Sequence, residues 1–185
     1  MMRTELNELR SERPLWRVEY DRLVEAGCFQ DERLELLHGR LVLMSPQNAP
    51  HATAVKKLNK LLVLLCGDDA DVRPQSPVVA GDDSEPEPDF AVVRPDDSME
   101  HPEAALLVIE VADSSLAKDR EVKAPLYAAA GYPEYWIVNL PERCVEIYRD
   151  PAGGRYRTAT TAVPGQRVRC LALPQIELLV DDVLP

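Results

Sequence analysis

The sequence lacks the features that mark export, membrane insertion and structural zinc sites. No apolar run approaches the length of about 20 residues that a membrane-spanning helix needs, and the polar start has neither the apolar core of a secretory signal nor the Arg-rich character of a transit peptide. The four cysteines are scattered without a C-x-x-C pair, which argues against a zinc site and a disulfide framework. We therefore expect a cytoplasmic protein with reduced thiols and no membrane partner.

Aromatic residues and positive charges are also scarce. The chain has two Trp and two Phe, too few to indicate a surface on which bases stack, so sequence-specific recognition of nucleic acid is unsupported. Lys and Arg number 21 against 32 Asp and Glu, which gives a formal net charge of -11. Such a charge repels nucleic acid at long range, because affinity for DNA comes largely from cations that replace counterions on phosphates. Any contact with nucleic acid must therefore depend on a local patch.

The chain is long enough for one compact domain. Its 185 residues contain no internal repeat, no low-complexity tract and no linker, which predicts a single domain over residues 1–185. Hydrophobic residues make up 45% and charged residues 29%, which is ordinary for a globular fold and argues against wholesale disorder. Residues 1–13 are mostly polar, and we expect them to fray.

The hydrophobic patterns predict a mixed α/β fold. Residues 32–46 read as a hairpin that turns at His38-Gly39, and the continuous run AALLVIEV reads as a strand covered on both faces, at the centre of the sheet. The order of helix, hairpin, helix, strands, helix and strands indicates an α/β domain with a mixed sheet. The expected helices span 14–29, 51–67 and 118–130; the expected strands span 76–80, 89–93, 104–111 and 134–139, followed by a meander over 144–161.

Two carboxylates stand within or beside these apolar strands. Asp89 follows Pro88 at the start of DFAVV, and Glu110 lies inside LLVIEV. On the expected strands Asp89 shares a face with Ala91, and Glu110 shares a face with Val108, so the two acids can converge. Burying an ionised carboxylate without a partner costs several kcal/mol or forces the group to take up a proton. Glu110 in particular therefore needs an explanation.

Three explanations of Glu110 are open. Its side chain faces water just beyond the covered region, or pairs with Arg or Lys, or binds a cation together with Asp89. Two acids on neighbouring strands favour a metal with oxygen ligands, which points to Mg²⁺ or Mn²⁺ rather than zinc. Chemistry at such a metal also needs a cation for the charge that develops, and Lys123 on the following helix can reach back, with Lys118 as the alternative. For either lysine, a solvated helix surface is the competing interpretation.

Several motifs follow one another in order from about Leu34 to Asn139. They are LELLHGRLVLMSP, His51, EPEPDF, LLVIEVADSS, DREVK and LYAAAGYPEYWIVN. As an ordered set they resemble the Uma2 family, also called the family of unknown function 820. The resemblance implies a restriction-endonuclease-like fold of the PD-(D/E)xK class, in which helices flank a mixed β-sheet. An N-terminal helix and a C-terminal β meander complete the expected architecture.

The resemblance also implies roles for individual residues. Asp89 and Glu110 would bind the metal, Glu35 would be an additional acidic ligand from the hairpin, and Lys123 would be the catalytic lysine, displaced from the strand onto the next helix. His51 matches a histidine at the start of the family's second helix, where we expect an accessory, ordering role.

Pro125 departs from a regular helix two residues after Lys123. A proline inside a helix removes a hydrogen bond and collides with the preceding turn, so we expect Lys123 to lie in an irregular or first-turn segment.

The implied activity is that of a Mg²⁺- or Mn²⁺-dependent endonuclease that hydrolyses phosphodiester bonds of nucleic acid, with DNA as the expected partner. Lys56, Lys57 and Lys60 could contact the nucleic-acid backbone, although a solvated helix face is the alternative. Two other functions stay open: a nuclease-like scaffold for protein interaction or regulation, and a metal-dependent phosphohydrolase of small nucleotides. Exposed strands at the sheet edge would permit a homodimer.

Overall fold

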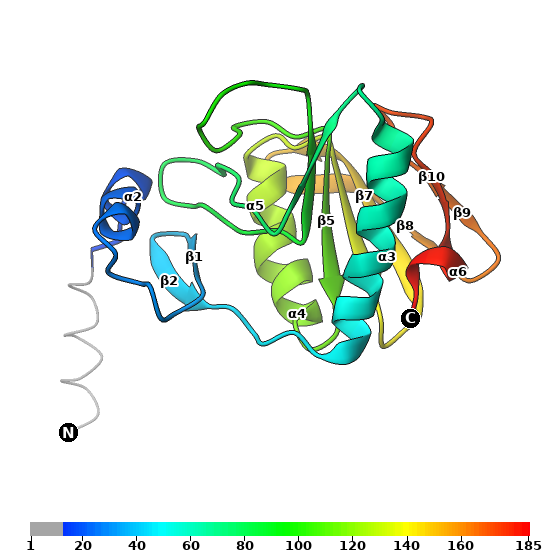
Figure 1. Ribbon diagram of the computed structural model, residues 1–185, viewed down its shortest axis with the longest axis horizontal. Coiled ribbons are helices and arrows are strands. Elements are labelled where there is room, and N and C mark those ends of the chain that lie inside the picture. Colours follow the sequence, from blue (N-terminus) through cyan, green and yellow to red (C-terminus); the bar gives the residue numbers. More distant parts are fainter. Residues whose placement is uncertain (1–12) are drawn as a thin grey trace.

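The computed structural model describes residues 13–185, in which helices flank a six-stranded mixed sheet (Figure 1). The order in the sheet is β3-β4-β5-β6-β7-β8. Strands β5 and β6 run parallel and every other neighbouring pair is antiparallel, which confirms the predicted mixed sheet. All but the last of residues 1–13, expected to fray, lie outside the described residues. The strands are β3 (Asp71–Pro74), β4 (Phe90–Val93), β5 (Leu107–Ala112), β6 (Glu134–Asn139), β7 (Cys144–Ala152) and β8 (Arg155–Ala162).

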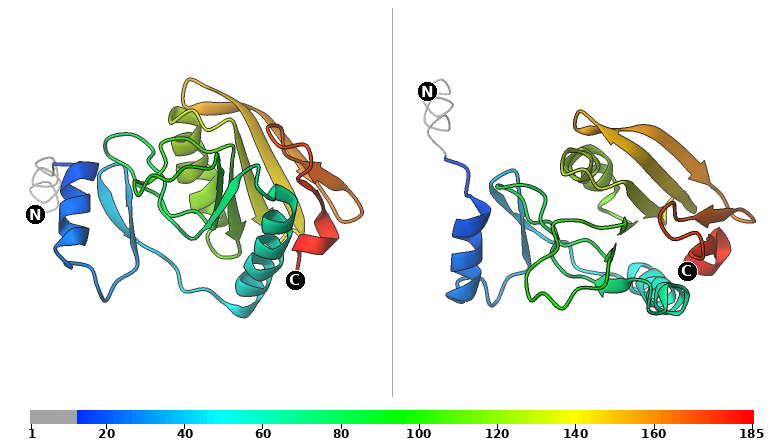
Figure 2. Two further views of the ribbon diagram at one scale, coloured as in Figure 1. Left: turned by 45° about the horizontal axis from the view of Figure 1, so that its top comes forward. Right: turned by 90° about the horizontal axis from the view of Figure 1, so that it is seen from above.

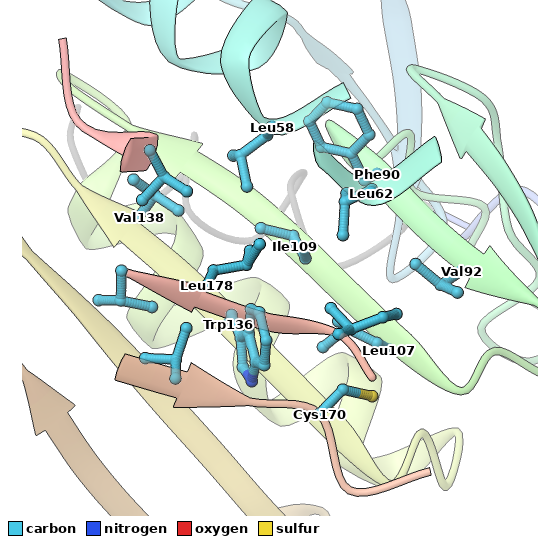
Figure 3. Close-up of a cluster of buried hydrophobic side chains, with 14 of the residues drawn as sticks. Leu58, Leu62, Phe90, Val92, Leu107, Ile109, Trp136, Val138, Cys170 and Leu178 are labelled. Carbon is cyan, nitrogen blue, oxygen red and sulfur yellow. The ribbon is translucent and has the colours of Figure 1, made fainter. Parts of the chain in front are cut away.

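Helices cover the two faces of this sheet (Figure 2). Helix α3 (Ala49–Cys66) lies on one face, where its buried leucines pack against side chains of the central strands. The other face carries α4 (Leu116–Lys118), the single π-helical turn η2 (Asp119–Lys123) and α5 (Ala124–Ala129). Figure 3 shows the core beneath α3, which includes Leu58, Leu62, Phe90, Ile109 and Trp136.

Strand β5 occupies the interior of the sheet, as its uninterrupted apolar sequence predicts. It lies between β4 and β6, and all six of its residues are buried. Val108 packs against the α5 side, whereas Ile109 packs against the α3 side. Because successive residues point to opposite faces, Glu110 must point to the α5 side, as Val108 does.

The predicted hairpin is confirmed and lies with α2 (Arg17–Glu25) at one end of the molecule (Figure 1). Strand β1 (Leu34–Leu37) pairs with β2 (Arg40–Leu43). His38 and Gly39 both have positive φ values, 50° and 71°, as a two-residue type I′ turn requires. A Cβ atom on Gly39 would lie only 2.3 Å from Cβ of Pro14, so the turn also packs closely against the preceding chain.

Elements near the C-terminus add to the core beneath α3. Strand β9 (Arg167–Arg169) pairs with β10 (Glu177–Leu179), and α6 (Val180–Val183) follows. Their apolar side chains, among them Leu178 and Val183, belong to the same buried cluster as Leu58. The sequence pattern predicts neither the β9–β10 pair nor the short helix α6.

The prediction of a strand over residues 76–80 is wrong. This segment lies in a loop, and β3 pairs with β4 in its place. Val78 is buried, but its amide donates to the carbonyl of Pro86 rather than to a neighbouring strand. Pro77 has no amide to donate, which disfavours a ladder at this point. The first helix is also shorter than expected and ends before Gly27, whose φ is 74°.

The remaining expectations concern cysteines and membranes. All four cysteines are free; Cys28 is exposed, and Cys66, Cys144 and Cys170 are buried. Between residues 13 and 185, no helix combines the length and the apolar character that a membrane crossing requires.

Candidate active site

Asp89 and Glu110 meet at one edge of the sheet, where β4 begins and β5 ends. Phe90 pairs with Ile109 in the antiparallel ladder, so the next positions in this register would set Asp89 opposite Glu110. Asp89 does not continue the ladder. Its side-chain Oδ2 instead accepts the amide of Val111 at 2.8 Å and so satisfies a buried donor of β5. The predicted convergence of the two acids is confirmed.

Glu110 is buried beside a lysine and a tyrosine. Its Oε1 accepts hydrogen bonds from Nζ of Lys123 at 2.8 Å and from the hydroxyl of Tyr127 at 3.0 Å. Burial raises the pKa of Glu110 to about 8, although Lys123 pulls the pKa the other way; the neighbouring Asp119 adds to the rise. Of the three explanations for a buried Glu110, the structure contains the ion pair with a lysine.

Glu35 lies against the same lysine. It is fully buried in the hairpin, and its Oε2 lies 2.9 Å from Nζ of Lys123, while its Oε1 accepts from Nζ of Lys118 at 2.8 Å. Burial alone would raise the pKa of Glu35, but the two ammonium groups outweigh it and lower the pKa. Glu35 therefore carries its charge in the interior, paired with two cations.

The π turn explains how Lys123 reaches the two acids. The amide of Ala124 donates to the carbonyl of Asp119, five residues back, and Pro125 follows in the first turn of α5. Pro125 has no amide for the carbonyl four residues before it, which disfavours an unbroken α-helix here. Lys123 is fully enclosed, and burial lowers its pKa less than Glu110 and Glu35 raise it. The expected irregular segment around Lys123 is confirmed, and it does not prevent Lys123 from contacting Glu110 and Glu35.

His51 lies on the other side of Asp89. Its Nε2 is 3.1 Å from Oδ2 of Asp89, and its backbone amide donates to Oδ1 of Asn48, the N-cap of α3. Burial lowers the pKa of His51, but the carboxylates of Asp89, Asp113 and Asp119 together outweigh burial and raise the pKa. Nδ1 of His51 is buried and has no hydrogen-bond partner among residues 13–185. Asn48 also donates to Asp113, so the first turn of α3 is tied to the residues that follow β5.

Asp89 and Glu110 each keep one oxygen free of donors. Within residues 13–185, no group donates to Oδ1 of Asp89 or to Oε2 of Glu110, and neither atom is among the buried polar atoms that lack a partner. Both residues line a pocket of about 70 Å³, together with Arg33, His51, Lys118 and Lys123. Two carboxylates that line one small pocket, each with an oxygen free of donors, suit Mg²⁺ or Mn²⁺, since hard divalent cations prefer oxygen ligands.

A second acidic group lies elsewhere in the described part of the chain. Glu142, Cys144 and Glu146 bring their ligand atoms to within 4.8 Å of one another. The guanidinium of Arg120 donates to Glu146 at 2.6 and 3.0 Å and to Glu142 at 3.3 Å. These carboxylates are therefore already paired with a cation, and we assign them no ligand.

The lysines expected on α3 do not gather at the pocket. Nζ of Lys57 donates to the carbonyl of Leu184 and so ties α3 to the C-terminal residues. Lys56 and Lys60 are exposed and are not among the residues that line the pocket. Arg33 does line it, paired with Glu87.

Sequence reasoning missed two side chains that shape the site. Tyr127 follows Lys123 by four residues, and helical spacing could have placed both on one face. Asp119 is buried beside the pocket, where its carboxylate accepts from the hydroxyl of Ser115 at 2.6 Å. The position of Asp119 depends on the π turn, for which the sequence offers only the signal of Pro125.

Comparison with known proteins identifies relatives of this fold. The family model described as "Uma2: Putative restriction endonuclease" matches residues 17–181. The crystal structure of "a putative nuclease belonging to DUF820" from Anabaena variabilis ATCC 29413 superimposes with a TM-score of 0.69. The two chains are 15% identical, and the match covers 84% of this chain and 91% of the other, so they share the fold. The search of the curated proteins finds no match.

Proposed function

Because the chain belongs to the Uma2 family, whose model is described as "Putative restriction endonuclease", we propose that it is a metal-dependent endonuclease that hydrolyses phosphodiester bonds of nucleic acid, and of DNA in particular. The observation that supports this proposal is the pair of donor-free oxygens on Asp89 and Glu110 beside the ammonium of Lys123. Mg²⁺ or Mn²⁺ bound by these oxygens would polarise the phosphodiester and lower the pKa of attacking water.

The protein's own side chains prepare this site for phosphoryl chemistry. Oδ2 of Asp89 is held by the backbone amide of Val111 and by the ring of His51, which leaves Oδ1 of Asp89 without a contact to either group. Tyr127 and Lys123 hold Oε1 of Glu110 in the same way. The ammonium of Lys123 has a fixed position before substrate arrives, and it would stabilise the negative charge that develops on the phosphoryl group without further rearrangement.

The geometry favours a polymeric substrate over a small nucleotide. A pocket that binds a whole small molecule usually has a volume of about 300 Å³ or more, whereas this pocket has about 70 Å³ and no aromatic side chain among its lining residues. There is room for a phosphate but no enclosure for a base. An interaction scaffold would have no need of two buried acids with donor-free oxygens beside a lysine, so no observation favours that alternative.

A plasmid-nicking assay tests the proposal. Wild-type protein with Mg²⁺ or Mn²⁺ should convert supercoiled DNA to open circles, and Asp89→Asn and Glu110→Gln should each lower the rate by at least about 100-fold, because each replaces a carboxyl group that would bind the metal with a neutral amide. Asp97→Asn makes the same chemical change at an exposed position outside the pocket and should leave the rate unchanged. Equal rates in all four proteins would overturn the proposal, as would hydrolysis of small nucleotides alone.

We further propose a homodimer that forms through β8. Among residues 13–185 this strand pairs with β7 alone, and six of its eight residues are exposed, so its outer edge could pair with a second copy. Light scattering should give twice the chain mass of 20.7 kDa. A mass of 20.7 kDa at all concentrations would contradict the dimer.

A further inference from the structure

The carboxylate of Glu35 differs from those of Asp89 and Glu110 in one respect: both of its oxygens are engaged. Oε1 accepts from Lys118 at 2.8 Å, and Oε2 lies 2.9 Å from Lys123 and accepts the amide of Glu87 at 3.3 Å. The side chain is completely buried, and it does not line the pocket that Asp89 and Glu110 share. A ligand role for Glu35 would require it to release at least one lysine and to turn towards the pocket.

The two lysines differ in how they meet the solvent. The side chain of Lys123 is 3% exposed, whereas that of Lys118 is 26% exposed, and both line the pocket. Glu35 supplies one negative charge to two ammonium groups, and Glu110 supplies a second one to Lys123. In a chain with a net charge of -11, the partly exposed ammonium of Lys118 is therefore the group of this set that can attract a phosphate oxygen.

We propose that Glu35 is a positioning residue for two lysines rather than a metal ligand, and that the more exposed one, Lys118, contacts a phosphate of the substrate. The contact with phosphate rests on the proposed function. Lys118 would bind as a compact point charge, with one hydrogen on Glu35 and two left for phosphate oxygens. Lys123, held between Glu35 and Glu110, would then serve the reacting phosphate.

Titration with Mn²⁺ alone, followed by calorimetry, tests the role of Glu35. Asp89→Asn should weaken Mn²⁺ binding by at least tenfold, because it neutralises a ligand, whereas Glu35→Gln should stay within about threefold of wild type. A loss in Glu35→Gln as large as that in Asp89→Asn would overturn the assignment. If Glu35→Gln does not fold, Lys118→Gln combined with Glu35→Gln removes a buried charge and one of its partners together, and the same comparison applies.

A DNA-binding measurement tests the contact of Lys118 with phosphate. Binding of a DNA duplex is followed by fluorescence anisotropy in Ca²⁺ at several salt concentrations. Lys118→Gln should weaken binding by about three- to tenfold and reduce the slope of log K against log salt by about one, because one phosphate contact is lost. Lys118→Arg should restore both values, and Mn²⁺ affinity should stay unchanged. Arg22→Gln removes the same charge at an exposed position on α2, outside the pocket, and should bind as wild type does.

The outcomes separate this inference from the proposed function. Wild-type affinity and salt slope in Lys118→Gln, with wild-type protein that binds and nicks DNA, would overturn the phosphate contact and leave the nuclease intact. A wild-type protein that neither binds nor nicks nucleic acid would overturn the proposed function and the phosphate contact together. The Mn²⁺ titration would still decide whether Glu35 is a positioning residue or a metal ligand.

Discussion

At the scale of single residues, the site is a set of charges that hold one another in a water-poor interior. Lys123 lies between the carboxylates of Glu35 and Glu110. Removal of one partner from a buried ion pair usually costs about 3–5 kcal/mol, because the other charge is left without compensation. The lysine is therefore expected to matter for folding as well as for chemistry.

Replacement of Lys123 by Met tests this dependence. Lys123→Met should lower the free energy of unfolding by about 3 kcal/mol, as measured by urea denaturation at pH 8. The double variant Lys123→Met/Glu110→Gln should recover part of the loss, because it also removes the stranded carboxylate. If the two single effects simply add in the double variant, the residues do not interact in the folded protein.

Glu85 lies in a separate buried cluster, close to Arg17 and His101. In the described part of the chain its Oε2 has no hydrogen-bond partner, and Oε1 lies 3.8 Å from Nε2 of His101. Burial raises the pKa of Glu85 from 4.5 to about 7; the charge of Asp21 adds to the rise, and that of Arg17 opposes it. Between these two values the unfolded chain loses its proton before the folded protein does, so stability falls as pH rises through this window.

Replacement of Glu85 by Gln should remove that loss. Glu85→Gln should be more stable than wild type at pH 8, by between about 1 and 3 kcal/mol since one pKa unit corresponds to about 1.4 kcal/mol, and the advantage should vanish near pH 4. Urea denaturation at both pH values measures it. An advantage of equal size at both pH values would point to packing instead of ionisation.

Sequence patterns identified the central residues of the site but not their supports. Asp89 and Glu110 were recognisable because a carboxylate in an apolar strand needs a partner, and Lys123 because a cation had to come from the next helix. Tyr127 and Asp119 carry no such signal. An ordinary tyrosine and an ordinary aspartate on a helix become part of the site only through the local geometry of the chain around Pro125.

At the scale of elements, the β1–β2 hairpin carries Glu35 into the site, and its turn fixes where the hairpin lies. Gly39 has φ of 71° and packs so closely that a Cβ atom would lie 2.3 Å from Cβ of Pro14. A change at the turn should therefore move the whole hairpin. The sequence predicted this element because His-Gly between two apolar runs is a turn signal.

Gly39→Ala and Gly165→Ala form a matched pair for this element. Gly165 has φ of 87°, but a Cβ atom there would meet no heavy atom within 4 Å. Gly165→Ala should cost about 1 kcal/mol for the left-handed backbone alone, whereas Gly39→Ala should cost at least twice as much because of the clash. Thermal unfolding of both variants measures the difference. Equal losses would show that Pro14 and the hairpin shift apart without strain.

Elements with weak local signals escaped prediction. Strand β3 has the sequence DVRP, which contains one apolar residue besides proline, and it forms because β4 offers it a partner. Strands β9 and β10 have three residues each and are set in place by burial beside α3. Such segments form through tertiary contacts with residues that are far away in the sequence. The continuous apolar run of β5, in contrast, predicts a strand from the local sequence alone.

At the scale of the whole molecule, an acidic chain must attract a polyanion through a small site. Metal binding at Asp89 and Glu110 would reverse the local charge without any change in the net charge of -11 that the protein chain carries. It would also couple metal concentration to the stability of the whole fold, because a ligand that binds only the folded state shifts the unfolding equilibrium.

Thermal unfolding in Mn²⁺ tests that coupling. At a Mn²⁺ concentration of about 100 times the dissociation constant, the gain is roughly 2.7 kcal/mol, or roughly 5–10 °C in Tm for a chain of this size. Asp89→Asn should show little or no rise. An unchanged Tm in wild-type protein across millimolar Mn²⁺ would argue against the site.

The distribution of the thiols gives the molecule a single point of chemical access. Cys28 is exposed after α2, while Cys66, Cys144 and Cys170 are shielded within the core. A maleimide dye should therefore react at one position in the native protein, on the N-terminal side of the hairpin. A fluorophore there, with the buried indole of Trp136 as an optical reference, would report how that end of the chain responds when nucleic acid arrives.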